Sequence, residues 1–157
     1  MIKVLFVCHG NICRSPMAEF IFKDMIMHEG LADEFVIASA ATSTEEIWNG
    51  IGNPVYPPAR EELAAHGISC KGKRAVQLTR QDYDKYDYLI GMDSANIRNM
   101  ERMTGHRGGK IHKLLEFAGR PDDVADPWYS GNFQVAYSDI EEGCRGFLKY
   151  LGVEKKI

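Results

Sequence analysis

The chain has 157 residues, of which 45% are hydrophobic and 26% are charged, and its formal net charge at pH 7 is −3. This composition predicts one globular domain over residues 1–157, and the negative net charge argues against bulk binding to nucleic acid. No apolar run approaches the ~20 residues of a membrane-spanning helix, and the N-terminal run has no signal-peptide cleavage site. We therefore expect a cytoplasmic protein, a monomer or a weak dimer, with four reduced cysteines and no membrane partner.

The N-terminal segment predicts a strand, a loop and the start of a helix. Residues 2–7, IKVLFV, form a short β-branched and aromatic run that is typical of a buried strand. Pro16 fits the first position of a helix that extends to about residue 28, with Ser15 as its N-cap. Its apolar residues at helical spacing are Ala18, Ile21, Phe22 and Met25. Residues 8–15 thus follow the carboxyl end of a strand and precede a helix, where α/β proteins bind ligands and anions.

The rest of the chain alternates between strand and helix patterns. The expected strands are residues 35–39, 88–92 and 110–114. The expected helices are residues 59–66, a short turn that begins at Thr79, a helix capped by Asp93 that ends near residue 103, and residues 133–151. Residues 40–58 and 118–132 are expected to be irregular, and residues 73–78 extended. The alternation predicts an α/β protein with a parallel sheet.

The loop after the first strand carries reactive groups. Cys8, Arg14 and Ser15 place a thiol, a guanidinium and a hydroxyl around one small concavity. Inward-facing backbone N–H groups of such a loop bind an oxyanion, and the planar fork of Arg14 matches two phosphate oxygens. The helix N-terminus and Arg14 both favour a thiolate at Cys8, placed for in-line attack on a bound phosphate. A cysteine at the end of a strand is often only a small apolar side chain in the core. The presence of Arg14 and Ser15 at this spacing favours a catalytic role for Cys8 instead.

The other residues of this loop are expected to shape it, to pack against it or to lie at its rim. Gly10 allows a tight turn, and Asn11 tolerates a left-handed backbone and locks the loop with its side-chain amide. Cys13 either packs against the loop or serves as a resolving thiol when Cys8 is oxidised. No second pair of ligands at zinc spacing accompanies these cysteines, so no metal or cofactor is expected. His9 is expected on the rim, as a substrate contact or a solvated side chain.

Expulsion of an alkoxide or phenolate from a phosphoester needs a general acid. Asp126 is the best candidate, because it lies in an irregular segment and Pro127 restrains its backbone. Asp93 is interpreted as a helix cap instead, and Asp122 and Asp123 as solvated loop charges.

Three aromatic residues occur in the expected loops: Trp48, Trp128 and Tyr129. They pack within the loops or the core, or they form a slot beside the loop that suits an aromatic phosphoester.

Residues 7–19, VCHGNICRSPMAE, together with residues 126–129, DPWY, resemble a low-molecular-weight protein tyrosine phosphatase. The resemblance implies a flavodoxin-like, four-stranded parallel sheet flanked by helices and a metal-free reaction through a cysteinyl-phosphate. It implies that Cys8 is the nucleophile, that Arg14 clamps the phosphate, and that Asp126 is first the acid and then the base. The implied phosphate- and substrate-binding residues are His9, Gly10, Asn11, Ile12, Cys13, Ser15, Trp48, Trp128 and Tyr129.

By the same resemblance, Ser39 supports Asn11 from behind the loop. Two departures from the family pattern are Lys73, where many members have histidine, and Ala41, where glycine is common.

Sister activities of this fold are the alternatives. Arsenate reductases need a further pair of cysteines on a mobile segment, whereas Cys70 and Cys144 stand far apart in this chain. Protein-arginine phosphatases carry threonine at the position of Ile12, so the apolar Ile12 favours phosphotyrosine. A non-catalytic module that binds phosphate or senses redox state is a third alternative.

Overall fold

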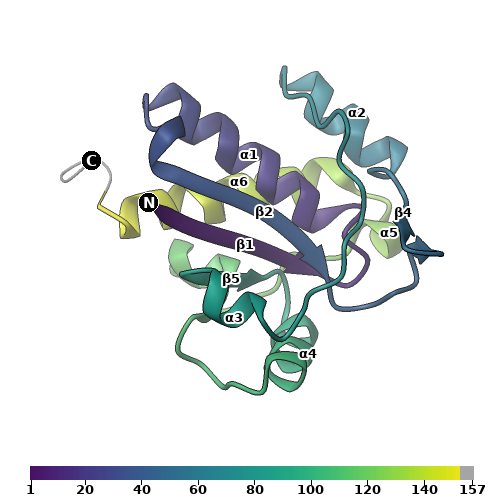
Figure 1. The fold of residues 1–157 in the computed structure, drawn as a ribbon. Coiled ribbons are helices and arrows are strands. Elements are labelled where there is room, and N and C mark those ends of the chain that lie inside the picture. The colour runs from purple at the N-terminus through teal and green to yellow at the C-terminus, as the bar shows by residue number, and fades with distance from the viewer. Residues whose placement is uncertain (153–157) are drawn as a thin grey trace.

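The computed structural model describes residues 1–152, and its centre is a sheet of four parallel strands (Figure 1). The strands are β1 (Ile2–Cys8), β2 (Phe35–Ala41), β5 (Tyr88–Gly91) and β6 (Ile111–Lys113), in the order β2-β1-β5-β6. The predicted α/β fold with a four-stranded parallel sheet is confirmed.

Helices cover both faces of the sheet. One hydrophobic core contains apolar residues of α1 (Arg14–His28), α2 (Pro57–Ala65) and α6 (Phe133–Tyr150). The second core lies on the opposite face, where α3 (Asp82–Lys85) and α4 (Ser94–Thr104) pack. Within residues 1–152, no helix is long and apolar enough to cross a membrane.

Strand β1 is buried on both faces, which explains its continuous apolar sequence. Val4 and Phe6 belong to the core beneath α1, while Leu5 and Val7 belong to the core beneath α4. None of the four is more than 2% exposed. Because side chains alternate along a strand, Cys8 at its end belongs to the same core as Phe6 and lies against the start of α1.

The strand order places the end of β1 at a switch point. After β1 the chain crosses to β2 on one side, and later it returns to β5 on the other side of β1. Ligands of open α/β sheets bind in the crevice beyond the carboxyl ends of such strands. Residues 8–15, called the Cys8 loop below, occupy this place.

The structure corrects the expectation that residues 40–58 are irregular. Strand β2 continues to Ala41, and β3 (Ile47–Trp48) and β4 (Ile51–Gly52) form an antiparallel hairpin. Asn49 and Gly50 connect them with φ values of 51° and 76°. Such a pair of left-handed residues suits a tight hairpin turn, and Asn-Gly is its strongest short sequence signal.

Two further boundaries differ from the prediction. Helix α1 begins at Arg14 with Cys13 in the cap position, so Ser15 lies inside the helix and is not its N-cap. The segment predicted as irregular over residues 118–132 contains α5 (Pro127–Ser130). The described chain also contains two short 3₁₀ helices, η1 (Ala32–Glu34) and η2 (Leu114–Ala118).

Candidate active site

The sulfur of Cys8 lies inside a ring of hydrogen-bond donors. The backbone N–H groups of Asn11 and Ser15 point at Sγ over 3.3 and 3.4 Å, and the Ser15 hydroxyl oxygen lies 3.0 Å from it. All three contacts come from the loop and the first turn of α1. The predicted nest and the predicted contact between Cys8 and Ser15 are therefore present.

Asn11 holds the loop in this shape. Its φ of 59° is in the left-handed region, as predicted, which asparagine tolerates better than most residues. Its Nδ2 donates to the hydroxyls of Ser15 (2.8 Å) and Ser39 (2.9 Å), and its Oδ1 accepts the N–H of Val76 (3.1 Å). The side chain is 1% exposed, so its bonds to Ser15 and Ser39 are buried, and its bond to Val76 is partly buried.

Gly10 does not supply a left-handed backbone to the turn of the loop. It is not among the glycines with positive φ. A Cβ at this position would lie 3.2 Å from Cγ of Glu46, so the glycine provides room for a neighbouring side chain.

The guanidinium of Arg14 is buried and held from several directions. Its Nη1 donates to Oδ2 of Asp93 and to the carbonyl of Val124, each over 2.8 Å, and its Nη2 lies 3.5 Å from Oδ2 of Asp126. Burial opposes the charge, but Cys8 and Asp93 outweigh it and raise the pKa of Arg14 above its usual value. The guanidinium is thus a fixed positive charge.

Asp93 has a second role that the sequence interpretation missed. Its Oδ1 accepts the N–H of Asn96 over 2.7 Å and completes a capping box at α4, which confirms the predicted cap. The same carboxylate binds Arg14 through its other oxygen. An aspartate cap on one helix therefore orients the arginine on another.

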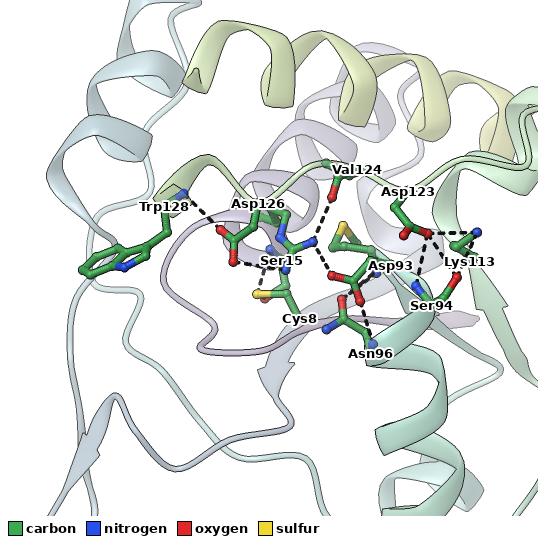
Figure 2. Close-up of polar contacts among 12 residues, drawn as sticks. Cys8, Ser15, Asp93, Ser94, Asn96, Lys113, Asp123, Val124, Asp126 and Trp128 are labelled. Carbon is green, nitrogen blue, oxygen red and sulfur yellow. Dashed lines mark hydrogen bonds and ion pairs between the residues drawn. The ribbon is translucent and has the colours of Figure 1, made fainter. Parts of the chain in front are cut away.

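Asp126 caps α5, with one carboxylate oxygen bound to Trp128 (Figure 2), and its other oxygen faces Arg14. Its Oδ1 accepts the N–H of Trp128 over 3.0 Å, which leaves Oδ2 toward Arg14 and the cavity. Its side chain is 27% exposed, so it is accessible to a substrate and to water.

The segment before Asp126 is anchored by ion pairs. Arg120 binds Asp122 and also reaches Asp139 and Glu142 on α6. Lys113 binds Asp123 over 3.0 Å. Asp122 and Asp123 are exposed loop charges, as expected, with side chains 51% and 45% exposed, and each also pairs with a basic side chain.

A cavity of about 130 Å³ opens above Cys8. The residues that line it are Cys8, His9, Gly10, Ile12, Cys13, Arg14, Glu45, Glu46, Asp126, Trp128 and Tyr129. Two residues of this set, Glu45 and Glu46, were missed by the sequence interpretation, which had no motif to single them out. A larger hollow of about 610 Å³ beside α2 contains none of the predicted site residues.

The predicted aromatic wall is partly present. Trp128 and Tyr129 line the cavity and are 53% and 86% exposed, and the Trp128 ring lies 4.7 Å from that of Tyr56. Trp48 is 80% exposed on the β3–β4 hairpin and is not among the lining residues. Trp128 and Tyr129 therefore form an open rim, whereas Trp48 is not part of the cavity wall.

Cys13 is a buried neighbour of Cys8. Burial, and after it the nearby Cys8, raises the pKa of Cys13 to about 12, so Cys13 is a protonated thiol at neutral pH. Within the described chain, all four cysteines are free. The resolving role of Cys13 stays a prediction.

A buried polar network supports the Cys8 loop from behind. The Ser39 hydroxyl accepts from Asn11 and donates to Oε1 of Glu19 over 2.6 Å. Lys73 donates to the Ser39 carbonyl over 2.9 Å, and its ammonium lies 3.6 Å from Glu19. Burial lowers the pKa of Lys73, and the Glu19 carboxylate opposes that shift. Lys73, the departure from the family pattern, is therefore an integral member of the network.

Replacement of Ser39 by alanine is expected to lower the free energy of unfolding by about 2 kcal/mol, because the substitution removes one hydrogen bond from the buried Glu19 and one from the buried Asn11. Urea denaturation measures this loss. Ser138→Ala, at an exposed position of α6, is the matched control and should change stability by less than about 0.5 kcal/mol. Equal effects of the two substitutions would contradict the role assigned to Ser39.

Comparison with known proteins identifies the family. The sequence pattern described as low molecular weight phosphotyrosine protein phosphatase matches residues 3–157. The low molecular weight protein-tyrosine-phosphatase YfkJ of Bacillus subtilis is 42% identical over 160 residues, with 100% of both chains covered. The crystal structure of YfkJ superposes with a TM-score of 0.91 at 41% identity, over 99% of this chain and 98% of that one.

Two other solved structures are similar. The low molecular weight protein tyrosine phosphatase SP-PTP of Streptococcus pyogenes has a TM-score of 0.84 at 39% identity, over 96% of this chain and 93% of that one. The Drosophila arginine phosphatase DARP has a TM-score of 0.85 at 31% identity, over 96% and 98% of the two chains. The resemblance found in the sequence is confirmed: the chain belongs to the low molecular weight phosphotyrosine protein phosphatase family and is a phosphoric monoester hydrolase.

Proposed function

We propose that the protein hydrolyses phosphotyrosine in proteins, and aryl phosphates in general, through a cysteinyl-phosphate on Cys8. The observation that carries the proposal is the cavity that brings Cys8, Arg14 and Asp126 together. A nucleophile, a fixed cation and a carboxyl group around one small cavity are the set that phosphoester cleavage requires.

In the first step, the Cys8 thiolate attacks phosphorus, and the bond from phosphorus to the phenolic oxygen breaks. Loop N–H groups and Arg14 bind the phosphoryl oxygens and stabilise the charge that develops on them. Asp126 donates its proton to the departing phenolate. The contact of Asp126 with Arg14 over 3.5 Å supports this placement, because the phosphate must lie against both residues.

In the second step, water attacks the cysteinyl-phosphate and the sulfur–phosphorus bond breaks. The Asp126 carboxylate now accepts a proton from the water. Departing sulfur becomes a thiolate again, and the Ser15 hydroxyl at 3.0 Å is placed to donate to it. Asn11 contributes by holding Ser15 and the loop in position.

Ile12 supports phosphotyrosine over the second candidate, phosphoarginine. The similarity to the Drosophila arginine phosphatase makes phosphoarginine the competing substrate. Ile12 is 8% exposed and lines the cavity, where its apolar side chain suits the face of a phenyl ring better than a polar guanidinium. Trp128 and Tyr129 at the rim extend this apolar surface.

The test compares three peptides of one sequence that carry phosphotyrosine, phosphoserine or phosphoarginine. We expect kcat/KM for phosphotyrosine to exceed the other two by at least about 100-fold, because the cavity wall and the acid are arranged for a phenol. Phosphate release is the measurement. A preference for phosphoarginine would establish the second candidate, and binding without phosphate release would support a non-catalytic module.

The wider setting is also proposed. We propose one phosphatase domain over residues 1–157, acting in the cytoplasm on phosphoproteins, as a monomer or a weak dimer. The four free cysteines of the described chain support a reducing compartment.

A further inference from the structure

Two carboxylates form part of the cavity wall and have no task in the proposed mechanism. Glu45 and Glu46 line the same cavity as Cys8. The Glu45 side chain is 68% exposed, and Glu46 is half-buried. Both therefore face whatever occupies the cavity above Cys8.

The segment that carries these glutamates is tied to the Cys8 loop. The N–H of Thr42 donates to the Cys8 carbonyl over 3.0 Å, and the N–H of Ser43 donates to the His9 carbonyl over 2.9 Å. These bonds continue the pairing of β2 with β1 past the end of the sheet. The two carboxylates therefore have a defined position relative to Cys8.

Glu46 is also fixed by its own contacts. Its Oε1 accepts from Nδ2 of Asn53 over 2.9 Å, and its Cγ lies over the free space at Gly10. The charge of Glu46 also contributes to the raised pKa of Cys13, below burial and three other groups in size. Its negative charge is thus felt inside the cavity.

Within residues 1–152, the side chains that line the cavity supply no excess positive charge to balance these two carboxylates. Arg14 is already bound to Asp93 and Asp126, and a phosphoryl group over Cys8 adds further negative charge beside it. His9 contacts Glu45 through Nε2 at 3.0 Å, so a protonated His9 offsets one glutamate at most. Among residues 1–152, no lysine lines the cavity. The mouth of the cavity is therefore negative when a phosphate is bound.

We infer that Glu45 and Glu46 select substrates in which lysine or arginine stands beside the phosphotyrosine. This inference rests on the proposed function and names the substrate class within it. An extended peptide advances about 3.3 Å per residue, so the residues on either side of a phosphotyrosine in the cavity lie at its rim. A cationic side chain there pairs with a glutamate, whereas an acidic one is repelled.

The experiment uses three phosphotyrosine peptides of equal length, with arginine, alanine or glutamate on both sides of the phosphotyrosine. We expect kcat/KM at low ionic strength to be about tenfold higher for the arginine peptide than for the glutamate peptide, with alanine between. At about 0.3 M salt the ratio should shrink to about twofold, because exposed charges are screened. Equal kcat/KM for the arginine and glutamate peptides at low salt would overturn the inference.

Two double variants assign the effect to these residues. In the double variant Glu45→Gln with Glu46→Gln, the ratio of kcat/KM for the arginine peptide to that for the glutamate peptide should fall to near one. In the double variant Glu45→Lys with Glu46→Lys, the preference should reverse. A reversed preference is a gain for one substrate, which misfolding cannot produce. Glu34→Gln, an exposed glutamate of η1 at the start of β2, is the matched control and should keep the parent ratio. If the lysine double variant kept the parent's ratio of kcat/KM for the arginine and glutamate peptides, the charge preference would not come from Glu45 and Glu46.

The alanine peptide separates this inference from the proposed function. If the alanine peptide is hydrolysed and the arginine and glutamate peptides have equal kcat/KM, only the inference about Glu45 and Glu46 is overturned. No turnover of any of the three peptides overturns the proposed function, and the inference with it.

Discussion

Replacement of Cys8 by serine is expected to abolish turnover of phosphotyrosine peptides, with a loss in kcat of at least about 10⁴-fold. A serine hydroxyl keeps the size of the side chain, but it is a far weaker nucleophile than a thiolate at neutral pH. The groups that contact Sγ in the described chain are two N–H groups and the Ser15 hydroxyl, and none of them is a base that would activate a serine. Phosphate release from a phosphotyrosine peptide measures the loss.

The Cys8→Ser variant should still fold and bind phosphate. Its backbone nest, Arg14 and Asn11 are unchanged, so thermal unfolding should still shift upward when phosphate is added. Cys70→Ser is the control, since Cys70 is also buried but lies outside the cavity, and turnover should persist. Turnover by Cys8→Ser near the parent rate would refute the cysteinyl-phosphate route.

Replacement of Asp126 by asparagine is expected to lower kcat for phosphotyrosine by about 10²–10⁴-fold, because the phenolate of tyrosine then leaves without a proton. Asparagine keeps an oxygen that can cap α5 and accept the N–H of Trp128, so the loop should retain its shape. An activated nitrophenyl phosphate has a better leaving group, so kcat for this substrate should fall much less in the Asp126→Asn variant. Steady-state kinetics on the two substrates provide the comparison.

Asp122→Asn is the matched control for this prediction. Asp122 lies in the same segment and binds Arg120, and it does not line the cavity. Replacement of Asp122 should change kcat for both substrates by the same small factor. If Asp126→Asn also slowed both substrates equally, the proton would not come from Asp126.

Local sequence signals predicted the Cys8 loop almost completely. Cys8, Asn11 and Ser15 lie within one turn and one loop, so their contacts follow from chain geometry alone. The same local logic was available for the β3–β4 hairpin, where Asn49-Gly50 is a strong turn signal that the sequence interpretation passed over. The mistaken N-cap at Ser15 has a local cause too, because the loop closes on Cys8 and starts the helix at Arg14.

Contacts between distant segments could not be predicted in this way. Asp93 carries a clear capping signal, yet nothing in its neighbourhood indicates that it also binds Arg14, which lies 79 residues away. Glu45 and Glu46 belong to no motif, and only the pairing of their segment with the Cys8 loop brings them to the cavity.

The sequence by itself determined the Cys8 loop, the four strands of the parallel sheet with the main helices between them, and the resemblance to the family. These depend on hydrogen bonds and side-chain periodicity between near neighbours, which a local pattern encodes. Only the tertiary structure decided how Asp126 and Val124 meet Arg14, since Val124 lies 110 positions after Arg14 in the sequence. Because the parallel order β2-β1-β5-β6 brings the carboxyl ends of β1 and β5 together, it joins loops that the chain itself keeps far apart.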